Sequence, residues 1–220
     1  MIDTVIFDMD GLLIDSEPLW YEAMQEVFAN QGVSITKELA SHTTGLRTIE
    51  VVHYWHRYFD WKNVSQEVLA DDIIDRVIGK IISTATVMPG THEILSFFRT
   101  KGVKMGLASS SPMRLIKAAL QHFKLEHYFD GLYSAEYEDY GKPHPAVYLS
   151  CAKALNASPL SCLAFEDSIN GMIAAKAARM KVVAVPEPHN FTNPKYVLAD
   201  LQLPGLADFT DLHWQQLAVV

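Results

Sequence analysis

Cysteine is scarce in this chain, and long apolar runs are absent from it. The two cysteines among the 220 residues, Cys151 and Cys162, have a spacing that fits neither a disulfide framework nor a zinc site. We expect both to be buried free thiols in a reducing compartment. No apolar stretch approaches the roughly 20 residues of a membrane-spanning helix, and the first residues lack the basic segment of a signal peptide. These absences predict a cytoplasmic protein that does not bind membranes.

Positive charge is also in short supply. The chain has 18 lysines and arginines against 26 aspartates and glutamates, which gives a formal net charge of -8 at pH 7. Binding to nucleic acid relies on lysine and arginine to neutralise phosphates, so this composition argues against a nucleic-acid partner. A small anionic substrate would need local cations to overcome the overall field. Hydrophobic residues make up 49 % of the chain, which is enough for a packed core.

Short apolar runs alternate with helical patterns over most of the chain. The runs that predict strands cover residues 4–8, 103–109, 131–136, 162–167 and 181–186. Continuously apolar strands separated by helices are typical of a parallel sheet that is covered on both faces. The predicted fold class is therefore α/β, with a Rossmann-like parallel-sheet core.

One region, residues 15–87, shows helical patterns and no strand pattern. Its expected helices cover 17–32, 48–59 and 65–84, and the segment "MPGTHE" that follows contains the chain-turning pair Pro89 and Gly90. We interpret the region as a helical cap domain inserted after the first strand. The predicted domains are a core of residues 1–14 and 88–220 and a cap of residues 15–87.

Polar side chains lie at the ends of several expected strands or directly after them. They are Asp8, Asp10, Ser109, Ser110, Ser111, Glu166 and Asp167, and Lys142 lies in a loop just before a helix. In open α/β sheets ligands bind outside the carboxyl ends of the strands, so we expect these groups to lie close together.

The first acidic pair has a spacing that suits a shared site. Residues two apart in an extended segment point the same way, so Asp8 and Asp10 can face one ligand, and Gly11 allows the chain to turn directly after them. Together with Asp167 these carboxylates would repel one another unless a hard cation lay among them. Oxygen ligands that leave room for water and phosphate suit Mg²⁺.

Four segments in order resemble the motifs of the haloacid dehalogenase superfamily. They are "FDMDGLLIDSEPLW", "LASSSP", "GKPHPAVYL" and "FEDSINGMIAAKAA". The resemblance covers essentially the whole chain, and the helical insertion is similar to the C1 cap of subfamily I. The chain is most similar to the sugar-phosphate branch, with its 2-deoxyglucose-6-phosphatases, hexitol phosphatases and β-phosphoglucomutases. The resemblance implies a Mg²⁺-dependent phosphomonoester hydrolase.

The resemblance also implies roles for the motif residues. Asp8 would be the nucleophile that forms a phosphoaspartate. Asp10 would protonate the leaving alkoxide and then activate water. Ser109 would donate a hydrogen bond to the transferring phosphoryl group, and Lys142 would neutralise charge in the transition state. The implied metal ligands are Asp8, the carbonyl of Asp10, Asp167 and Glu166, and Glu166 would act through water or by orienting the other groups.

The expected substrate contacts are Glu17, Trp20, Gly45, Arg47, Ser110 and Ser111. Gly45 would bring the cap backbone close to the ligand, and Arg47 would bind a phosphate or a hydroxyl group. Arg47 as a surface residue remains an alternative. Ser111 could instead cap a helix that starts at Pro112. Asp167 or Ser168 could cap the helix that follows them, and Glu17 could complement a helix dipole.

Two enzymes of the resembled branch remain as hypotheses, a sugar-phosphate phosphatase and a β-phosphoglucomutase-like mutase. In those mutases a cap histidine couples substrate binding to the position of the acid/base, and the matching residue here is Trp20. Indole can stack on a sugar but cannot accept a hydrogen bond. We therefore expect hydrolysis of a small phosphorylated sugar or polyol, such as 2-deoxyglucose 6-phosphate, by a monomer. A signalling receiver module is a third hypothesis, but receivers are shorter and carry no helical insertion.

Overall fold

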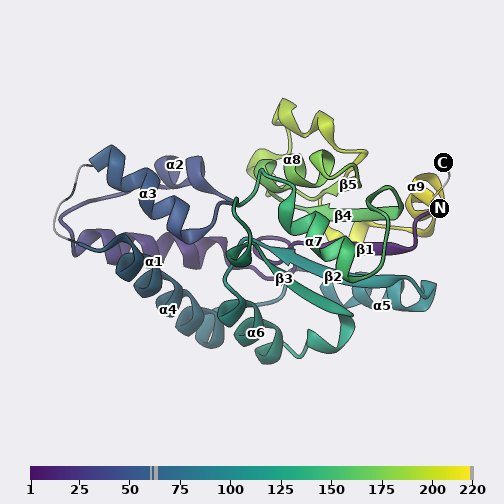
Figure 1. The fold of residues 1–220 in the computed structure, drawn as a ribbon, viewed down its shortest axis with the longest axis horizontal. Helices are drawn as coiled ribbons and strands as arrows, with labels where there is room; N and C mark the ends of the chain where they lie inside the picture. Colours follow the sequence, from purple (N-terminus) through teal and green to yellow (C-terminus); the bar gives the residue numbers. More distant parts are fainter. Residues whose placement is uncertain (60, 62–63, 219–220) are drawn as a thin grey trace.

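The chain folds around a six-stranded parallel sheet whose strand order is β3-β2-β1-β4-β5-β6 (Figure 1). The structure is a computed structural model, and it describes residues 1–59, 61 and 64–218. The strands are β1 (Thr4–Phe7), β2 (Lys104–Ser109), β3 (Gly131–Ser134), β4 (Cys162–Glu166), β5 (Lys181–Ala184) and β6 (Leu201–Gln202). The predicted fold class and its five strands are confirmed. Strand β6 was not predicted, because two residues are too few to form a pattern.

Strand β1 lies inside the sheet, hydrogen-bonded to β2 on one side and β4 on the other. Thr4 is opposite Lys104 of β2 and Cys162 of β4, and the pairing continues to Phe7. All residues of β1 and β4 are buried. Because both faces are covered, these strands are apolar except at Thr4 and Glu166 and do not alternate with polar residues. The polar residues that follow β1, β2 and β4 are therefore delivered to one edge of the sheet.

Helices cover both faces of the sheet, as Figure 1 shows. The helices of the core are α5 (Thr91–Lys101), α6 (Met113–His122), α7 (Ala146–Ala154), α8 (Ile169–Ala177) and α9 (Asp211–Ala218). Large side chains such as Phe7 and Phe165 belong to the hydrophobic cluster that includes α5 and α6. Small ones such as Ala108 and Ala164 belong to the cluster that includes α7 and α8. The small side chains allow α7 and α8 to pack close to the sheet.

The cap consists of helices that follow β1 and pack on one another at one end of the molecule (Figure 1, left). They are α1 (Glu17–Ala29), α2 (Lys37–Ala40), α3 (Thr48–Phe59) and α4 (Gln66–Thr84). The start of α4 is stabilised by Ser65, whose side chain accepts a hydrogen bond from the backbone N–H of Val68. Trp55 and Phe28 are fully buried in the interior of the cap. The predicted helical insertion after the first strand is confirmed.

Short 3-10 turns complete the chain. They are Ser41–Thr43, Glu126–Tyr128, Ala135–Tyr137, Pro159–Ser161, Pro188–Asn190, Pro194–Leu198 and Leu206–Asp208. Within the described residues, no helix is both long enough and apolar enough to cross a lipid bilayer.

The chain crosses between cap and core twice, and the two crossings are hydrogen-bonded to each other. Ile14 pairs with Val87 in an isolated antiparallel bridge. The backbone N–H of Asp15 donates to the carbonyl oxygen of Thr86 at 2.9 Å, and the backbone N–H of Met88 donates to the carbonyl oxygen of Leu13 at 2.9 Å. We propose that the domains divide here, with residues 15–87 as the cap. The junction begins only a few residues after β1, so any cap movement acts close to Asp8 and Asp10.

The aromatic cluster under the sheet yields a prediction about stability. Phe98 is fully buried, with its ring centroid 6.0 Å from that of Phe7, 5.6 Å from Phe165 and 5.4 Å from Phe209. Phe98→Ala should lower the free energy of unfolding by about 3–5 kcal/mol, because it removes apolar contacts and leaves a cavity. Urea unfolding followed by circular dichroism measures this, with exposed Leu212→Ala as the control. Equal losses in both variants would contradict the prediction.

Candidate active site

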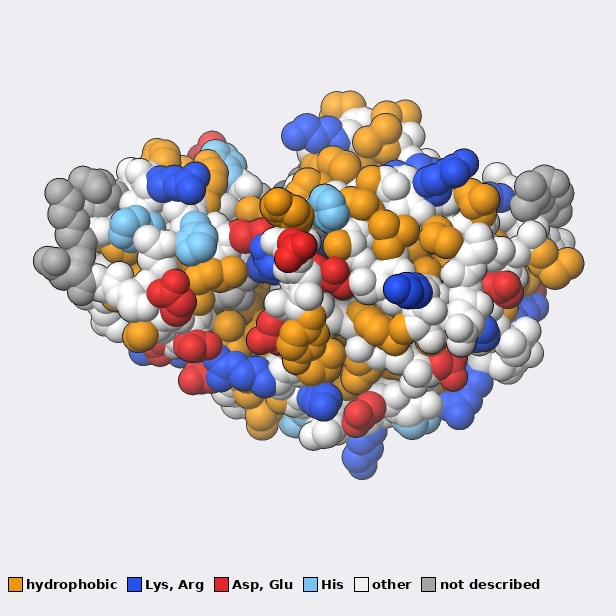
Figure 2. Space-filling model, viewed as in Figure 1, with side chains coloured by type: hydrophobic (Ala, Val, Ile, Leu, Met, Phe, Trp, Pro, Cys, Tyr) orange, Lys and Arg blue, Asp and Glu red, His pale blue; other side chains and the backbone are white. Residues whose placement is uncertain are grey.

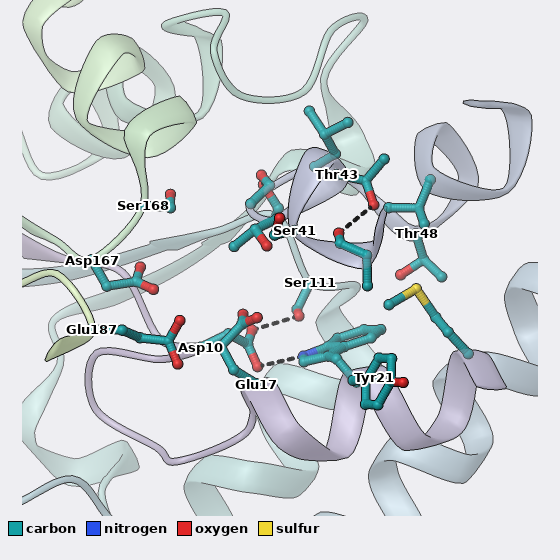
Figure 3. Close-up of a pocket in the computed structure, with 18 of the residues that line it drawn as sticks. Asp10, Glu17, Tyr21, Ser41, Thr43, Thr48, Ser111, Asp167, Ser168 and Glu187 are labelled. Atoms are coloured by element: carbon teal, nitrogen blue, oxygen red, sulfur yellow. Dashed lines mark hydrogen bonds between the residues drawn. The ribbon is translucent and has the colours of Figure 1, made fainter. Parts of the chain in front are cut away.

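A cavity of about 570 Å³ lies between the cap and the carboxyl ends of the strands. The predicted site residues that line it are Asp8, Asp10, Glu17, Trp20, Gly45, Ser109, Ser110, Ser111, Lys142 and Asp167. Figure 3 shows Asp10, Glu17, Asp167 and Glu187 gathered on one side and Ser41, Thr43 and Thr48 of the cap on another. The fold thus brings together residues that are far apart in the sequence, as the strand-end rule predicts.

The Lys142 side chain connects two of the buried carboxylates. Its ammonium group donates to Asp8 Oδ1 at 2.7 Å, to Glu166 Oε1 at 2.6 Å and to the carbonyl oxygen of Ala108 at 3.0 Å. These bonds use all three donors of the ammonium group. Burial acts to lower the pKa of Lys142, but the charges of Asp8 and Glu166 outweigh it and raise the pKa. Lys142 therefore stays protonated and holds the Asp8 carboxylate in one orientation.

Glu166 is fully buried behind Lys142 and does not line the cavity. Its Oε1 also accepts from the Tyr148 hydroxyl at 2.6 Å, and its Oε2 accepts from the backbone N–H and hydroxyl of Ser168 at 3.4 and 3.2 Å. A Cβ at position 171 would overlap the Glu166 carboxylate, so Gly171 gives it room beside α8. Both carboxylate oxygens of Glu166 thus accept hydrogen bonds from protein groups. Glu166 contacts the active site through its bond with Lys142.

The acidic side chains at the site outnumber the cations that could balance them. Carboxylate oxygens of Asp8, Glu166 and Asp167 lie within 4.8 Å of one another. Burial, opposed by Lys142, raises the pKa of Asp8 to about 7. Burial together with the charges of Glu166 and Asp8 raises the pKa of Asp167 well above its usual range. A divalent cation would offset this repulsion, and a buried all-oxygen set is the chemistry that Mg²⁺ prefers.

Gly11, which follows Asp8 and Asp10, allows the Asp167 side chain to lie close to the turn after β1. Its φ angle is +71°, a conformation that L side chains rarely adopt. A Cβ there would overlap the Asp167 carboxylate and would lie 3.2 Å from Glu17 Cγ. The glycine therefore brings the turn after β1 close to the end of β4.

Asp10 is held by side chains from three parts of the molecule. Its Oδ1 accepts from the hydroxyl of Ser16 at 2.7 Å and from the indole N–H of Trp20 at 3.0 Å. Its Oδ2 accepts from the hydroxyl of Ser111 at 2.7 Å. Figure 3 shows the bonds from the indole and from Ser111. The carboxylate is therefore tied to the junction, to cap helix α1 and to the loop after β2.

The bond from Trp20 corrects an expectation. The sequence predicted that an indole at this position would not couple substrate binding to the position of Asp10, since indole cannot accept a hydrogen bond. The structure shows that the indole instead donates a hydrogen bond to the Asp10 carboxylate, so the cap is linked to this residue. Trp20 belongs to cap helix α1, so this bond joins the cap to the core.

The three serines after β2 have different partners. Ser109 is buried, and its hydroxyl lies 3.5 Å from Asp10 Oδ2. The hydroxyl of Ser110 donates to the carbonyl oxygen of Gly45 at 2.7 Å, which joins the core to the cap. Ser111 does not cap a helix, because α6 begins at Met113 and the hydroxyl of Ser111 is bound to Asp10. The capping alternative is thus wrong for Ser111.

Ser168 does cap a helix. Its side chain accepts from the backbone N–H of Gly171 at 3.1 Å at the start of α8. Since the serine satisfies the first turn of α8, the neighbouring Asp167 carboxylate remains available to the cavity, which it lines.

Arg47 does not line the cavity, so the structure does not show the expected substrate contact. Its guanidinium donates to the carbonyl oxygens of Glu138 at 2.8 Å and Ala135 at 3.2 Å, and it forms an ion pair with Glu50. Its side chain is only 16 % exposed, so the alternative of a solvated surface arginine does not hold either. The arginine instead joins the cap to the core.

Sequence reasoning missed other residues that line the cavity. Glu187 and His189 follow β5, and Tyr21, Lys37, Ser41 and Thr44 come from the cap. Burial and the charges of Asp10 and Glu187 raise the pKa of Glu17 to about 8. The strand-end rule could have indicated Glu187, which comes shortly after β5. No comparable signal distinguishes the cap residues, because their sequence pattern is that of ordinary amphipathic helices and loops.

Comparison with known proteins gives consistent findings. The model of the haloacid dehalogenase-like hydrolase family matches residues 2–179. Hexitol phosphatase B of Escherichia coli (strain K12) is 45 % identical over 207 residues, which cover 93 % of this chain and 93 % of that protein. A phosphorylated carbohydrates phosphatase of Thermotoga maritima is 34 % identical over 181 residues, covering 80 % of this chain and 82 % of that protein.

The fold also matches that of a solved structure, the β-phosphoglucomutase of Clostridium difficile. The TM-score is 0.86, the sequence identity is 23 %, and the match covers 99 % of this chain and 97 % of the other. At this identity the likeness concerns the fold alone.

The acidic cluster generates a prediction that is independent of catalysis. Mg²⁺ should raise the melting temperature by several degrees, because an ion that binds only the folded state stabilises it. Asp167→Asn should remove most of this shift, whereas Asp15→Asn, which changes an exposed acid outside the cluster, should keep it. Differential scanning fluorimetry across a Mg²⁺ titration provides the measurement. An unchanged shift in Asp167→Asn would contradict the cation site.

Proposed function

This chain belongs to the haloacid dehalogenase-like hydrolases and is a phosphatase of that family; we propose that it hydrolyses the phosphomonoesters of hexitols and hexoses. The observation that carries the proposal is the Asp8 carboxylate, which Lys142 holds at the end of β1. It faces a cavity that also contains Asp10 and, from the cap, several hydroxyl groups. We propose further that the protein acts as a monomer in the cytoplasm.

Asp8 is assigned as the nucleophile. Lys142 is bound to Oδ1, so we assign Oδ2 as the oxygen that attacks phosphorus. The new bond from Asp8 to phosphorus replaces the bond from phosphorus to the sugar oxygen, which gives a phosphoaspartate and an alkoxide. Asp10 protonates that alkoxide, then removes a proton from the water that cleaves the phosphoaspartate. Inorganic phosphate and free Asp8 result.

The hydrogen bonds of Asp10 indicate which oxygen carries its proton. Trp20 can only donate, so Oδ1 must remain an acceptor. The hydroxyl of Ser111, which faces Oδ2, can either donate or accept. We therefore assign the transferred proton to Oδ2. Trp20 thus orients the acid/base as well as lining the cavity, where it can still stack on a sugar.

Mg²⁺ is the cofactor that best fits the acidic cluster. We propose that Asp8, Asp167 and the carbonyl oxygen of Asp10 hold it, while Glu166 acts on the site through Lys142 or a water. When bound, the ion supplies positive charge that stabilises the phosphoryl oxygens. The residues themselves position the nucleophile and move the proton.

The cavity suits the neutral end of a polyol. The cap lines it with hydroxyl-bearing residues, among them Ser41 and Thr44, and the carboxyl groups of Glu17 and Glu187 lie on the side that holds Asp10. Carboxylates accept hydrogen bonds from sugar hydroxyls, and side-chain hydroxyls can both donate and accept. This lining supports a hexitol or hexose whose phosphate lies at Asp8, in agreement with the names of the relatives.

The β-phosphoglucomutase-like alternative requires a second phosphate site, because a mutase retains a bisphosphate between its two transfers. Among the described residues that line the cavity, the lysines are Lys142 and Lys37, and none is an arginine. Lys37 is exposed beside Glu38, and Arg47 is bound to the core. Apart from Lys142, the described lining therefore offers no buried lysine or arginine for a second phosphate, which favours the phosphatase.

A substrate panel tests the proposed function. Wild-type protein with Mg²⁺ should release phosphate from hexitol 6-phosphates and from 2-deoxyglucose 6-phosphate, and EDTA should stop the release. Asp8→Asn should lower turnover by several orders of magnitude, because an amide cannot form the phosphoaspartate. Phosphate release is measured colorimetrically, with circular dichroism to confirm that the variant is folded. Full activity in EDTA or in Asp8→Asn would refute the mechanism.

A phosphorus NMR time course separates the phosphatase from the mutase. With β-glucose 1-phosphate and a trace of the bisphosphate, the inorganic phosphate signal should grow without prior growth of glucose 6-phosphate. The reason is that the described lining offers Lys142 as its one buried lysine and no arginine, which supports a single phosphate site. If glucose 6-phosphate grows first, the mutase assignment is the correct one.

A further inference from the structure

Arg47 lies at the start of α3 in the cap, but its guanidinium binds the core. One terminal nitrogen, Nη1, donates to the carbonyl oxygens of Ala135 and Glu138 at 3.2 and 2.8 Å. The other, Nη2, donates to the carbonyl oxygen of Asp139 at 3.3 Å and to Glu50 Oε1 at 2.7 Å. One side chain of the cap thus binds three main-chain carbonyls of a single core segment.

Glu50, one turn further along α3, extends this contact. Its Oε1 also accepts from the backbone N–H of Gly141 at 3.3 Å, and its Oε2 accepts from the backbone N–H of Arg47 at 3.2 Å. A Cβ at position 141 would lie 2.5 Å from Glu50 Oε2 and 2.9 Å from Arg47 Cγ and Nε. Only glycine at this position permits so close an approach. We call Arg47 and Glu50, bound to residues 135–141, the clamp.

The bound segment leads directly into the active site. Residue 141 precedes Lys142, whose ammonium group holds Asp8 and Glu166. Tyr137 and Tyr140 of the segment are exposed, whereas its main chain is bound by the clamp. In Figure 2, acidic and basic side chains lie side by side where the cap meets the core. A contact of this kind transmits the position of the cap to the loop that carries Lys142.

Neighbouring contacts show that the clamp belongs to a closed cap. The carbonyl oxygen of Thr44 accepts from the side-chain amide of Asn170 at 2.9 Å, and that of Gly45 accepts from Ser110 at 2.7 Å. All of these bonds join cap to core, so they break together when the cap moves away. The bonds from Asn170 and Ser110 are accepted by backbone carbonyls of the cap, whereas the clamp consists of two charged cap side chains.

We propose that Arg47 and Glu50 are positioning residues, which stabilise the closed cap and fix the Lys142 loop for phosphoryl transfer. The kinetic test of this inference rests on the proposed phosphatase function. Neither residue touches the cavity where the substrate binds. The clamp acts through the main chain of residues 135–141, so it serves every phosphomonoester that enters, whatever its sugar.

The kinetic test compares Arg47→Ala with Arg76→Ala. Arg76 forms ion pairs with Glu26 and Asp72 inside the cap, so it is a matched arginine that does not reach the core. Arg47→Ala should lower kcat about tenfold for both a hexitol phosphate and a small aryl phosphate. A change of this size is within the usual range of coupling between sites. Arg76→Ala should leave both values unchanged. A loss confined to the KM of the hexitol phosphate would instead make Arg47 a substrate contact and overturn the proposal.

Two further variants test whether the clamp acts as a unit. Glu50→Gln combined with Arg47→Ala should be no worse than Arg47→Ala alone, since removal of either partner opens the clamp. Gly141→Ala disturbs the clamp from the core side and should reproduce the loss of kcat. Additive losses in the double variant, or a wild-type kcat in Gly141→Ala, would contradict the proposal. Melting temperatures close to wild type exclude a general loss of folding.

A distance measurement tests the clamp without any substrate. Nitroxide labels attached through Val68→Cys and Leu160→Cys, both at exposed positions, report the separation of cap and core by pulsed electron paramagnetic resonance. The native cysteines are buried and should not react. Arg47→Ala should shift the distances to larger values, whereas Arg76→Ala should keep the wild-type distribution. An unchanged distance distribution in Arg47→Ala overturns the proposed role of the clamp. Absence of sugar-phosphate hydrolysis by the wild type would refute only the proposed function, because the distance measurement needs no substrate.

Discussion

The buried ammonium group of Lys142 is the interaction on which the site depends. It lies between Asp8 and Glu166 with its three donors all in use, and without it two buried carboxylates would face each other. Removing one partner of a buried, hydrogen-bonded charge pair typically costs about 3–5 kcal/mol. The surrounding structure therefore has to keep three segments in place at once, namely the end of β1, the end of β4 and the loop before α7.

The parallel sheet provides this placement through strand order and through glycines. Because β1 lies next to β4, the residues that follow both strands meet at one edge. Gly11 and Gly171 then allow backbone and carboxylate to approach more closely than any other residue would permit. The result is an excess of negative charge that raises the pKa of Asp8 and of Asp167. Such an arrangement is unfavourable in isolation and is suited to a bound cation.

The cap completes the site, and two of its contacts with the core lie next to the reacting groups. Trp20 binds Asp10, and Arg47 binds the segment before Lys142. The cap therefore contacts both the acid/base and the segment that leads to Lys142. Closure of the cap can thus exclude water and position both groups in one event. We regard this double contact as the reason why the cap follows β1 so directly.

The amino-acid sequence by itself determined the elements and the chemical character of the site. Apolar runs between helices predict the parallel sheet, and strand ends rich in acids predict where a ligand binds, because both follow from local pattern and general topology. The direction of individual side chains was decided only by the tertiary structure. Arg47 turned to the core rather than to the cavity, and Trp20 donated a hydrogen bond to Asp10. The physical reason is that such partners are separated by up to 92 residues, and only the packing of cap on core brings them into contact.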